Sequence, residues 1–354
     1  MKKTQAALMT GAALAGAGAI CAGATAVAVY RGLSNLMSRR LQGKVVLITG
    51  GSRGLGLAMA EEFGRRGARL VLTARDPNEL ERARTLLVRR RVARDESDVL
   101  VIPADLRDVS QVEQMVQRAT SAFGEINILV NNAGIITVGP VENQTAQDFR
   151  EVMEANFFTG LHCSLAILPQ MLRRRGGSIV NIASIGGKIP VPHLLPYTAS
   201  KFAAVGFSQG LNAELRSKGI HVLTVCPGLM RTGSHLQAQF TGDAAKEYRW
   251  FSFSANLPGA STSAAAAARR IVRAVLLKES EIAITPQAIL ASRSASLAPE
   301  LVAQAMSLAN RLLPSPADGQ QEPRPGSHFR NAEVRPIAST IGSAAARRYN
   351  QTAI

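Results

Sequence analysis

The sequence has few cysteines and histidines, and few acidic residues relative to its basic ones. Its 354 residues include three cysteines and five histidines. Cys21, Cys163 and Cys226 are odd in number and far apart, so they indicate neither a disulfide framework nor a metal site. The histidines also lack the spacing of metal ligands, and we therefore expect no structural metal.

Acidic residues number 25 against 41 lysines and arginines, which gives a formal net charge of +16. Such an excess favours anionic partners: phosphate-bearing ligands, acidic lipid or nucleic acid. The sequence lacks a basic stripe interleaved with aromatic residues and lacks a nucleic-acid recognition motif, so we expect no nucleic-acid partner. Hydrophobic residues make up 46% of the chain, which is enough for a packed core.

Charge is absent from residues 4–30, with lysines before this stretch and arginines after it. The length suits a membrane span, although most of its residues are Ala and Gly. Three interpretations stay open: a retained anchor, a cleaved secretory signal, and a small-residue helix that lies on protein or lipid. We expect residues 1–40 to be a membrane anchor with lipid as a partner. Basic residues are more numerous after the span than before it, which predicts that the remainder of the chain lies in the cytoplasm.

Short apolar runs alternate with stretches of helical length between residues 41 and 290. The seven runs are GKVVLITG, ARLVLTA, DVLVIPA, INILVNNAG, GSIVNIAS, IHVLTVCPG and EIAITP. This alternation is typical of a parallel sheet covered by helices on both faces. We therefore predict one α/β domain over residues 41–290, a doubly wound Rossmann fold with a seven-stranded parallel sheet.

The pattern stops after Pro286. Residues 299–314 have the apolar spacing of an amphipathic helix, and we assign the segment 291–314 to it. We expect this helix to pack on the domain; the alternative is that it lies on a membrane. From Ser315 to the end, at residue 354, large apolar residues are scarce, so we predict a mostly disordered tail.

A glycine-rich stretch, TGGSRGLG, occupies residues 49–56, directly after the first predicted strand and at the start of a helix. Glycines at positions 50, 54 and 56 allow a tight turn and a close approach to a pyrophosphate, while the helix N-terminus supplies N–H donors. The position between strand and helix therefore favours a dinucleotide-binding loop. Its expected contacts include Gly50, Ser52, Arg53, Gly54, Leu55 and Gly56.

Arg75 follows the second predicted strand, where a site that prefers NAD usually has a carboxylate. Arg53 lies within the glycine loop. Two guanidinium groups favour a 2′-phosphate, because charge-assisted bonds to phosphate oxygens are strong. Asp76 follows at once and could instead bind a ribose, but we predict NADP (NADPH) as the cofactor.

Ser184, Tyr197 and Lys201 carry the spacing of a reaction centre. Tyr197 and Lys201 are four residues apart and share one face of a helix. A nearby ammonium should lower the phenol pKa from about 10, and Lys201 can also bind the ribose of the cofactor. Ser184 can hold a substrate oxygen. The alternative is a turn serine, a rim tyrosine and a solvated lysine. We expect His193, between Ser184 and Tyr197, in a surface loop rather than at the substrate mouth.

The chain resembles the short-chain dehydrogenase/reductase superfamily over residues 41–285. The motifs described above occur in the order found in that superfamily, together with ADLRD, NNAG, EANFFTG, YTASK and PGLMRT. The resemblance implies that Asn156 helps to place a water that connects Lys201 to solvent. It also implies further cofactor contacts from Asp105, Leu106, Asn132, Ala133, Gly134, Pro227, Gly228 and Thr232, and homo-oligomers are common in the family.

The resemblance implies an oxidoreductase that interconverts a carbonyl and an alcohol. The N-terminal segment, which lies outside the resemblance, adds the expectation that the protein is membrane-associated with a cytoplasmic catalytic domain. Cellular NADP pools are kept reduced, so we expect reduction. The segment 232–259 should form a lid and holds five aromatic residues: Phe240, Tyr248, Trp250, Phe251 and Phe253. We therefore expect a small lipophilic substrate, unless these rings pack the lid onto the body or a second subunit. The alternative function is a non-catalytic NADP-binding sensor or scaffold at the membrane.

Overall fold

Seven strands form the central sheet of the computed structural model, which describes residues 41–257, 259–319, 322–329 and 336–351. The strands are β1 (Val45–Thr49), β2 (Arg69–Ala74), β3 (Val99–Pro103), β4 (Ile128–Asn131), β6 (Gly177–Ile182), β7 (Ile220–Cys226) and β11 (Glu281–Ala283). They lie in the order β11-β7-β6-β4-β1-β2-β3, and every neighbouring pair is parallel. Each apolar run of the sequence contributes one strand, which confirms the predicted doubly wound α/β fold.

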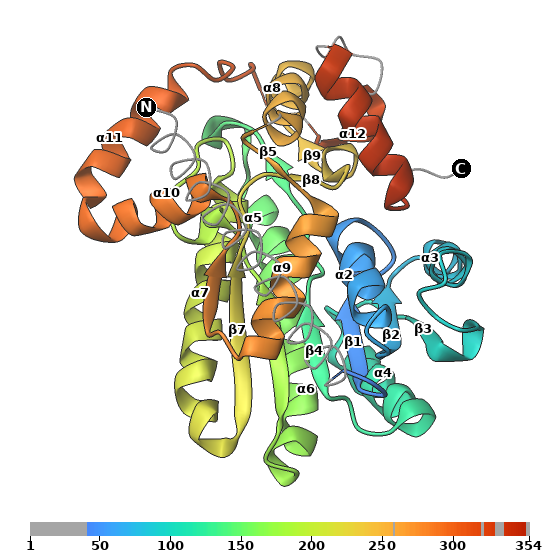
Figure 1. Cartoon of the computed structure of the whole chain (residues 1–354). Helices are drawn as coiled ribbons and strands as arrows, with labels where there is room; N and C mark the ends of the chain where they lie inside the picture. The colour runs from blue at the N-terminus through green and yellow to red at the C-terminus, as the bar shows by residue number, and fades with distance from the viewer. Residues whose placement is uncertain (1–40, 258, 320–321, 330–335, 352–354) are drawn as a thin grey trace, which may run out of the picture. The chain divides into compact units, whose positions relative to one another are not determined.

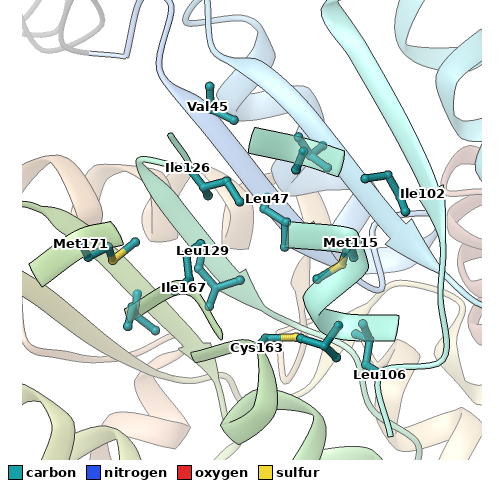
Figure 2. Packing of buried hydrophobic residues seen from close by; sticks show 14 of the residues in the cluster. Val45, Leu47, Ile102, Leu106, Met115, Ile126, Leu129, Cys163, Ile167 and Met171 are labelled. Atoms are coloured by element: carbon teal, nitrogen blue, oxygen red, sulfur yellow. The ribbon is translucent and has the colours of Figure 1, made fainter. Parts of the chain in front are cut away.

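Helices cover both faces of this sheet (Figure 1). Alternate residues of a strand point to opposite faces, and Val45 and Leu47 point into a core that includes side chains of α4 and α6 (Figure 2). That face is covered by α4 (Val109–Phe123), α6 (Thr159–Arg173) and α7 (Leu195–Leu215). On the other face, α2 (Gly54–Gly64) packs against α9 (Ala264–Leu277), and α3 (Pro77–Arg89) lies beside β2 and β3.

The helix before α6 begins as α5 (Ala146–Met153) and then widens into a π-helical turn at Glu154–Phe158. Thr145 caps α5 in a reciprocal capping box with Asp148, which fixes where the helix starts. A π-turn adds a residue to one turn of a helix and often occurs at functional sites. Here the turn contains Asn156, whose side chain is buried.

Short strands and one helix lie beyond the carboxyl ends of the main strands. β5 (Thr137–Val138), β9 (Gln239–Phe240) and β12 (Arg324–Pro325) form a small sheet, and β8 (Met230–Arg231) pairs with β10 (Thr262–Ser263). The predicted lid contains β9 and α8 (Ala244–Asn256).

The predicted C-terminal amphipathic helix is divided in two. The structure has α10 (Pro286–Leu297) and α11 (Pro299–Asn310), which pack against each other. The break falls at Ala298, whose backbone is not helical. Proline disfavours a helical conformation in the residue before it, so Pro299 ends one helix and starts the next.

The tail predicted to be disordered contains regular structure in its described part. β12, a 3₁₀ turn at Gly326–Phe329 and α12 (Pro336–Arg348) belong to the same compact unit as the sheet, Gly43–Ile354. The composition of the tail suggested disorder, but a few apolar residues are enough to pack the tail against the domain. Ala346 and Tyr349 are buried, and Phe329 packs against the aromatic residues of the lid.

The predicted membrane anchor at residues 4–30 lies outside the described residues. Within the described part of the chain, no helix combines the length and the hydropathy needed to cross a membrane.

Candidate active site

The predicted site residues gather at one edge of the sheet, where the parallel strands have their carboxyl ends. The glycine loop follows β1, Arg75 follows β2, Asp105 follows β3, Asn132–Gly134 follows β4, Ser184 follows β6 and Pro227–Thr232 follows β7. Tyr197 and Lys201 lie in α7. In doubly wound folds this edge is where ligands bind.

The glycine loop depends on its glycines. Gly50 and Gly54 have φ values of +60° and +58°, in the left-handed region that side chains avoid. A Cβ on Gly56 would overlap the carbonyl oxygen of Gly50, so only glycine allows α2 to start this close to the turn. Leu55 is buried in the first turn of α2. The loop therefore has the form of a dinucleotide cradle at a helix N-terminus.

Thr49 joins the glycine loop to the NNAG segment. Its hydroxyl oxygen accepts hydrogen bonds from the main-chain N–H groups of Asn132 at 2.9 Å and Ala133 at 3.0 Å. The Asn132 side chain donates to the carbonyl oxygens of Thr49 at 3.0 Å and Gly50 at 3.1 Å. Two of the predicted cofactor segments are thus fixed to each other.

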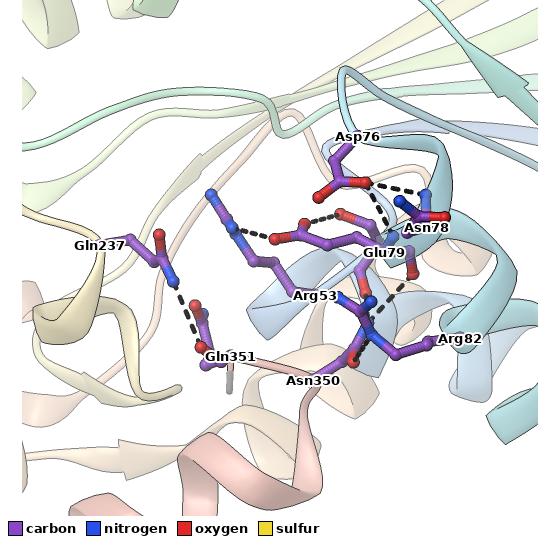
Figure 3. Close-up of polar contacts among 9 residues, drawn as sticks. Arg53, Asp76, Asn78, Glu79, Arg82, Gln237, Asn350 and Gln351 are labelled. Atoms are coloured by element: carbon purple, nitrogen blue, oxygen red, sulfur yellow. Dashed lines mark hydrogen bonds and ion pairs between the residues drawn. The ribbon is translucent and has the colours of Figure 1, made fainter. Parts of the chain in front are cut away.

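Arg53 and Arg75, the two predicted 2′-phosphate residues, differ in their surroundings. Arg75 is exposed just after β2. Arg53 forms an ion pair with Glu79 at 2.6 Å, and Ser52 donates to the other oxygen of the same carboxylate at 3.0 Å (Figure 3). Sequence reasoning missed Glu79. Its signal was an acidic residue in the first turn of a helix, which is ordinarily a favourable partner of the helix dipole.

Asp76, the alternative ribose partner, caps α3. One of its carboxylate oxygens accepts from the main-chain N–H groups of Asn78 at 2.8 Å and Glu79 at 3.2 Å (Figure 3). This is a standard N-cap arrangement.

Asp105 and Leu106 follow β3. The Asp105 carboxylate bonds Arg107, which lowers the pKa of Asp105 below its usual value. The Leu106 side chain is part of the core (Figure 2), so any contact with an adenine would come from its main chain.

The structure brings Ser184, Tyr197 and Lys201 together. The Lys201 Nζ lies 5.6 Å from the centre of the Tyr197 ring and donates to the carbonyl oxygen of Ile182 at 3.0 Å. A Cβ on Gly134 would lie 3.7 Å from the same Nζ, so the NNAG segment passes directly beside Lys201.

Burial dominates the electrostatics of this group. It raises the pKa of Tyr197, while a hydrogen bond with Ser184 acts in the opposite direction. It also lowers the pKa of Lys201 to about 8. The spacing of Tyr197 and Lys201 predicted a lowered Tyr197 pKa, from the positive charges of the ammonium and of an oxidised nicotinamide, and did not include the desolvation of the phenolate.

Asn156 connects the NNAG segment to α7. Its side-chain oxygen accepts from the Ile135 N–H at 2.7 Å, and its amide donates to the Ile135 carbonyl and to the Ser200 hydroxyl, both at 3.0 Å. Ser200 in turn donates to the carbonyl oxygen of Tyr197 at 2.7 Å. Sequence reasoning missed Ser200, which is fully buried. Asn156 thus helps to position the segment of α7 that carries Tyr197.

The loop after β7 completes the edge. The Pro227 carbonyl accepts from the Ile185 N–H at 2.8 Å, which joins this loop to the turn that begins at Ser184. Thr232 is buried, and its hydroxyl accepts from the Ser234 N–H at 3.2 Å. Gly228 packs so closely against Thr285 that a Cβ would lie 2.5 Å from the threonine hydroxyl.

His193 is buried, so the expected surface position is wrong. Its Nδ1 lies 2.8 Å from a carboxylate oxygen of Glu247 in α8, and Trp250 donates to the other oxygen at 2.5 Å. Glu247 is fully buried as well. No local sequence pattern indicates this link, because Glu247 is 54 positions away from His193.

The aromatic residues of the lid pack largely against one another. Phe240, Tyr248 and Phe251 are buried in one apolar cluster, and Trp250 and Tyr197 lie partly buried against it. The packing alternative therefore accounts for most of the enrichment, while Tyr197 still lies beside an apolar surface.

Known proteins resemble the chain in sequence and in structure. Residues 44–241 match the family model described as short chain dehydrogenase. A dehydrogenase/reductase SDR family protein 7-like of Anopheles gambiae is 36% identical over 249 residues, 70% of this chain and 77% of that protein. The 3-oxoacyl-[acyl-carrier-protein] reductase FabG of Haemophilus influenzae is 34% identical, over 54% of this chain and 76% of its own length.

Two solved structures are similar. A short-chain dehydrogenase from Streptomyces avermitilis has a TM-score of 0.64 and 27% identity, and the match covers 76% of this chain and 97% of that one. Levodione reductase has a TM-score of 0.60 and 28% identity, over 70% and 98% of the two chains. With the fold, the glycine loop and the family match in agreement, the chain belongs to the short-chain dehydrogenase/reductase family, oxidoreductases that use a nicotinamide cofactor.

Proposed function

We propose that the chain is an NADP(H)-dependent reductase that converts a carbonyl to an alcohol, with Tyr197 as the proton donor. The observation that carries the proposal is that partly buried Ser184 and Tyr197 and buried Lys201 lie together at the edge of the sheet that carries the glycine loop. The cofactor supplies the hydride when bound, and the protein supplies position and the proton. Ser184 holds the substrate oxygen, and Lys201 holds the cofactor and adds positive charge.

The protonated state of Tyr197 and the names of two similar proteins are consistent with reduction. Burial keeps the phenol protonated at neutral pH, which is the form that can give a proton to a carbonyl oxygen. Two similar proteins are named as reductases, the 3-oxoacyl-[acyl-carrier-protein] reductase and levodione reductase.

Three features of the loops after β1 and β2 support NADP over NAD. Arg75 is exposed, and the Arg53 guanidinium is partly exposed. Asp76, the carboxylate that could have met a ribose, caps α3. Glu79 counts against NADP, since its charge would lie near a 2′-phosphate bound by Arg53. The two guanidinium groups outweigh this one carboxylate.

The cluster beside Tyr197 supports a lipophilic substrate. The described residues around the phenol include apolar side chains of the lid and of the Ser184–Tyr197 loop, such as Val191 and Leu194. An apolar substrate group placed there would be removed from water, which favours binding by about 25 cal/mol per Å² of apolar surface.

A carbonyl panel tests the function. Short aldehydes, acyl ketones and steroid ketones would each be mixed with the protein and NADPH, and the absorbance of NADPH followed. We expect oxidation of NADPH with the lipophilic ketones and slower oxidation of NADH. A protein that binds NADPH but oxidises it with no member of the panel would contradict the proposal.

A further inference from the structure

The C-terminal segment touches the glycine loop. The main-chain N–H of Gly54, the first residue of α2, donates to the carbonyl oxygen of Tyr349 at 2.9 Å. N–H groups at the start of this helix are the donors that a dinucleotide pyrophosphate uses. A carbonyl oxygen of the protein therefore takes up one donor of the cradle.

Gln351 lies in the cradle as well. A Cβ built on Gly54 would be 2.9 Å from the side-chain nitrogen of Gln351 and 4.0 Å from the Cβ of Thr232. The Gln351 amide thus lies beside both the glycine loop and the segment expected to hold the nicotinamide end. Gln351 is 8% exposed, and its side-chain oxygen has no hydrogen-bond partner among the described residues. Such an unsatisfied acceptor lowers the stability of the seated segment, so the segment is easier to displace.

Asn350 joins the segment to the glycine loop and to α3 (Figure 3). Its amide donates to the carbonyl oxygens of Ser52 at 3.0 Å and Glu79 at 3.1 Å, and its oxygen accepts from Arg82 at 3.3 Å. Its φ is +56°, a left-handed conformation that Asn tolerates better than most residues. Gln237 donates to the Gln351 carbonyl at 3.2 Å.

The preceding helix joins this segment to the lid. α12 packs against α8 (Figure 1), and a Cβ on Gly342 would lie 2.9 Å from the Asn256 side chain. Ala346 packs so closely on Gly233 that a Cβ there would lie 2.7 Å from the Ala346 Cα. Gly233 directly follows Thr232, so α12 also touches the expected nicotinamide segment.

We propose that Tyr349–Gln351 is an internal competitor of the cofactor, which leaves the glycine loop when the dinucleotide binds. The inference rests on the proposed function and adds a means of regulation to its site. The Gly54 N–H cannot donate fully to the Tyr349 carbonyl and to a phosphate oxygen at once. If only one molecule in ten has the segment released, the apparent dissociation constant rises about tenfold.

Cofactor titration tests this inference. The full-length protein and a chain that ends at Arg348 would be titrated with NADPH, with the fluorescence of the bound cofactor as the readout. We expect the shortened chain to bind NADPH about tenfold more tightly. The full-length variant Asn350→Gly keeps a backbone that accepts positive φ but loses three side-chain bonds, and it should bind more tightly too. Asn310→Gly, at the exposed end of α11, is the matched control and should change nothing.

Equal or weaker binding by the shortened chain would overturn the inference and leave the proposed function standing; weaker binding would mean that the segment completes the site. If neither chain binds NADPH or NADH, the proposed function fails and the competition fails with it.

A second measurement uses the unmodified protein. Trypsin cleaves after arginine, and Arg347 and Arg348 directly precede the segment. The carbonyl oxygen of Arg348 accepts a hydrogen bond from Arg90 at 2.7 Å. NADPH should accelerate this cleavage by releasing the segment. Cleavage that NADPH slows or leaves unchanged would contradict the inference.

Discussion

Arg53 and Glu79 form an ion pair of 2.6 Å at the mouth of the glycine loop. A bound 2′-phosphate would compete with Glu79 for the guanidinium and would be repelled by the carboxylate. Glu79→Gln removes the charge and keeps the shape, so we expect NADPH to bind several-fold more tightly, while NADH changes little. Fluorescence titration with both cofactors measures the ratio. An equal gain for NADH would show that Glu79 acts on the loop and not on the phosphate.

Arg75 lies exposed after β2, near enough to Asp105 to interact with it electrostatically. Arg75→Ala should weaken NADPH by about tenfold to a hundredfold, because a charge-assisted bond contributes roughly 1.5–3 kcal/mol. NADH should be affected much less. Arg89→Ala removes a similar exposed arginine at the end of α3 and serves as the control. Equal losses for the two cofactors would contradict the assignment of Arg75 to the 2′-phosphate.

The fold was predictable because its signals are local. Each strand is a short apolar run, and the glycine loop needs glycine at defined positions, so a reader of the sequence can place β1 and α2 directly. The carboxyl ends of parallel strands share one edge, and this rule alone brings Ser184 near the loop after β1.

The errors came from interactions between distant residues. Glu247 reaches His193 across 54 positions, and Asn350 reaches Ser52 across 298. No periodicity in the sequence reports such contacts. Composition indicated a disordered tail because it counts apolar residues and cannot show where Tyr349 is buried. The rise that burial causes in the Tyr197 pKa was not foreseen for a related reason, since desolvation depends on packing that spacing does not reveal.

Asn156 should contribute to stability as well as to the site. Asn156→Ala removes three hydrogen bonds, two to Ile135 and one to Ser200. We expect a loss of about 2–4 kcal/mol in the free energy of unfolding, measured with urea. Asn310→Ala at an exposed position should stay within about 0.5 kcal/mol of the parent. If Asn156→Ala unfolded like that control, the bonds of the π-turn would not stabilise the fold.

Lys201 should determine the alkaline limb of the pH–rate profile, where the rate of carbonyl reduction falls as the pH rises. Its pKa of about 8 means that the side chain is charged below that pH and neutral above it. If the ammonium is needed, carbonyl reduction falls as the pH rises through about 8. In Lys201→Arg the guanidinium stays charged, so the residual rate of reduction should no longer fall as the pH rises through about 8. Initial rates between pH 6 and 10 give both profiles. An alkaline limb unchanged in the arginine variant would mean that another group titrates.

Tyr197→Phe tests the central claim most directly, because it removes the hydroxyl and little else. The measurement is the rate of NADPH oxidation with the best ketone of the panel, with the NADPH dissociation constant determined alongside. A proton donor contributes about 10²- to 10⁴-fold to the rate, so reduction should fall by that factor while NADPH affinity stays within about twofold. A Tyr197→Phe protein that reduced the ketone at a near-normal rate would contradict the assignment of Tyr197 as the proton donor.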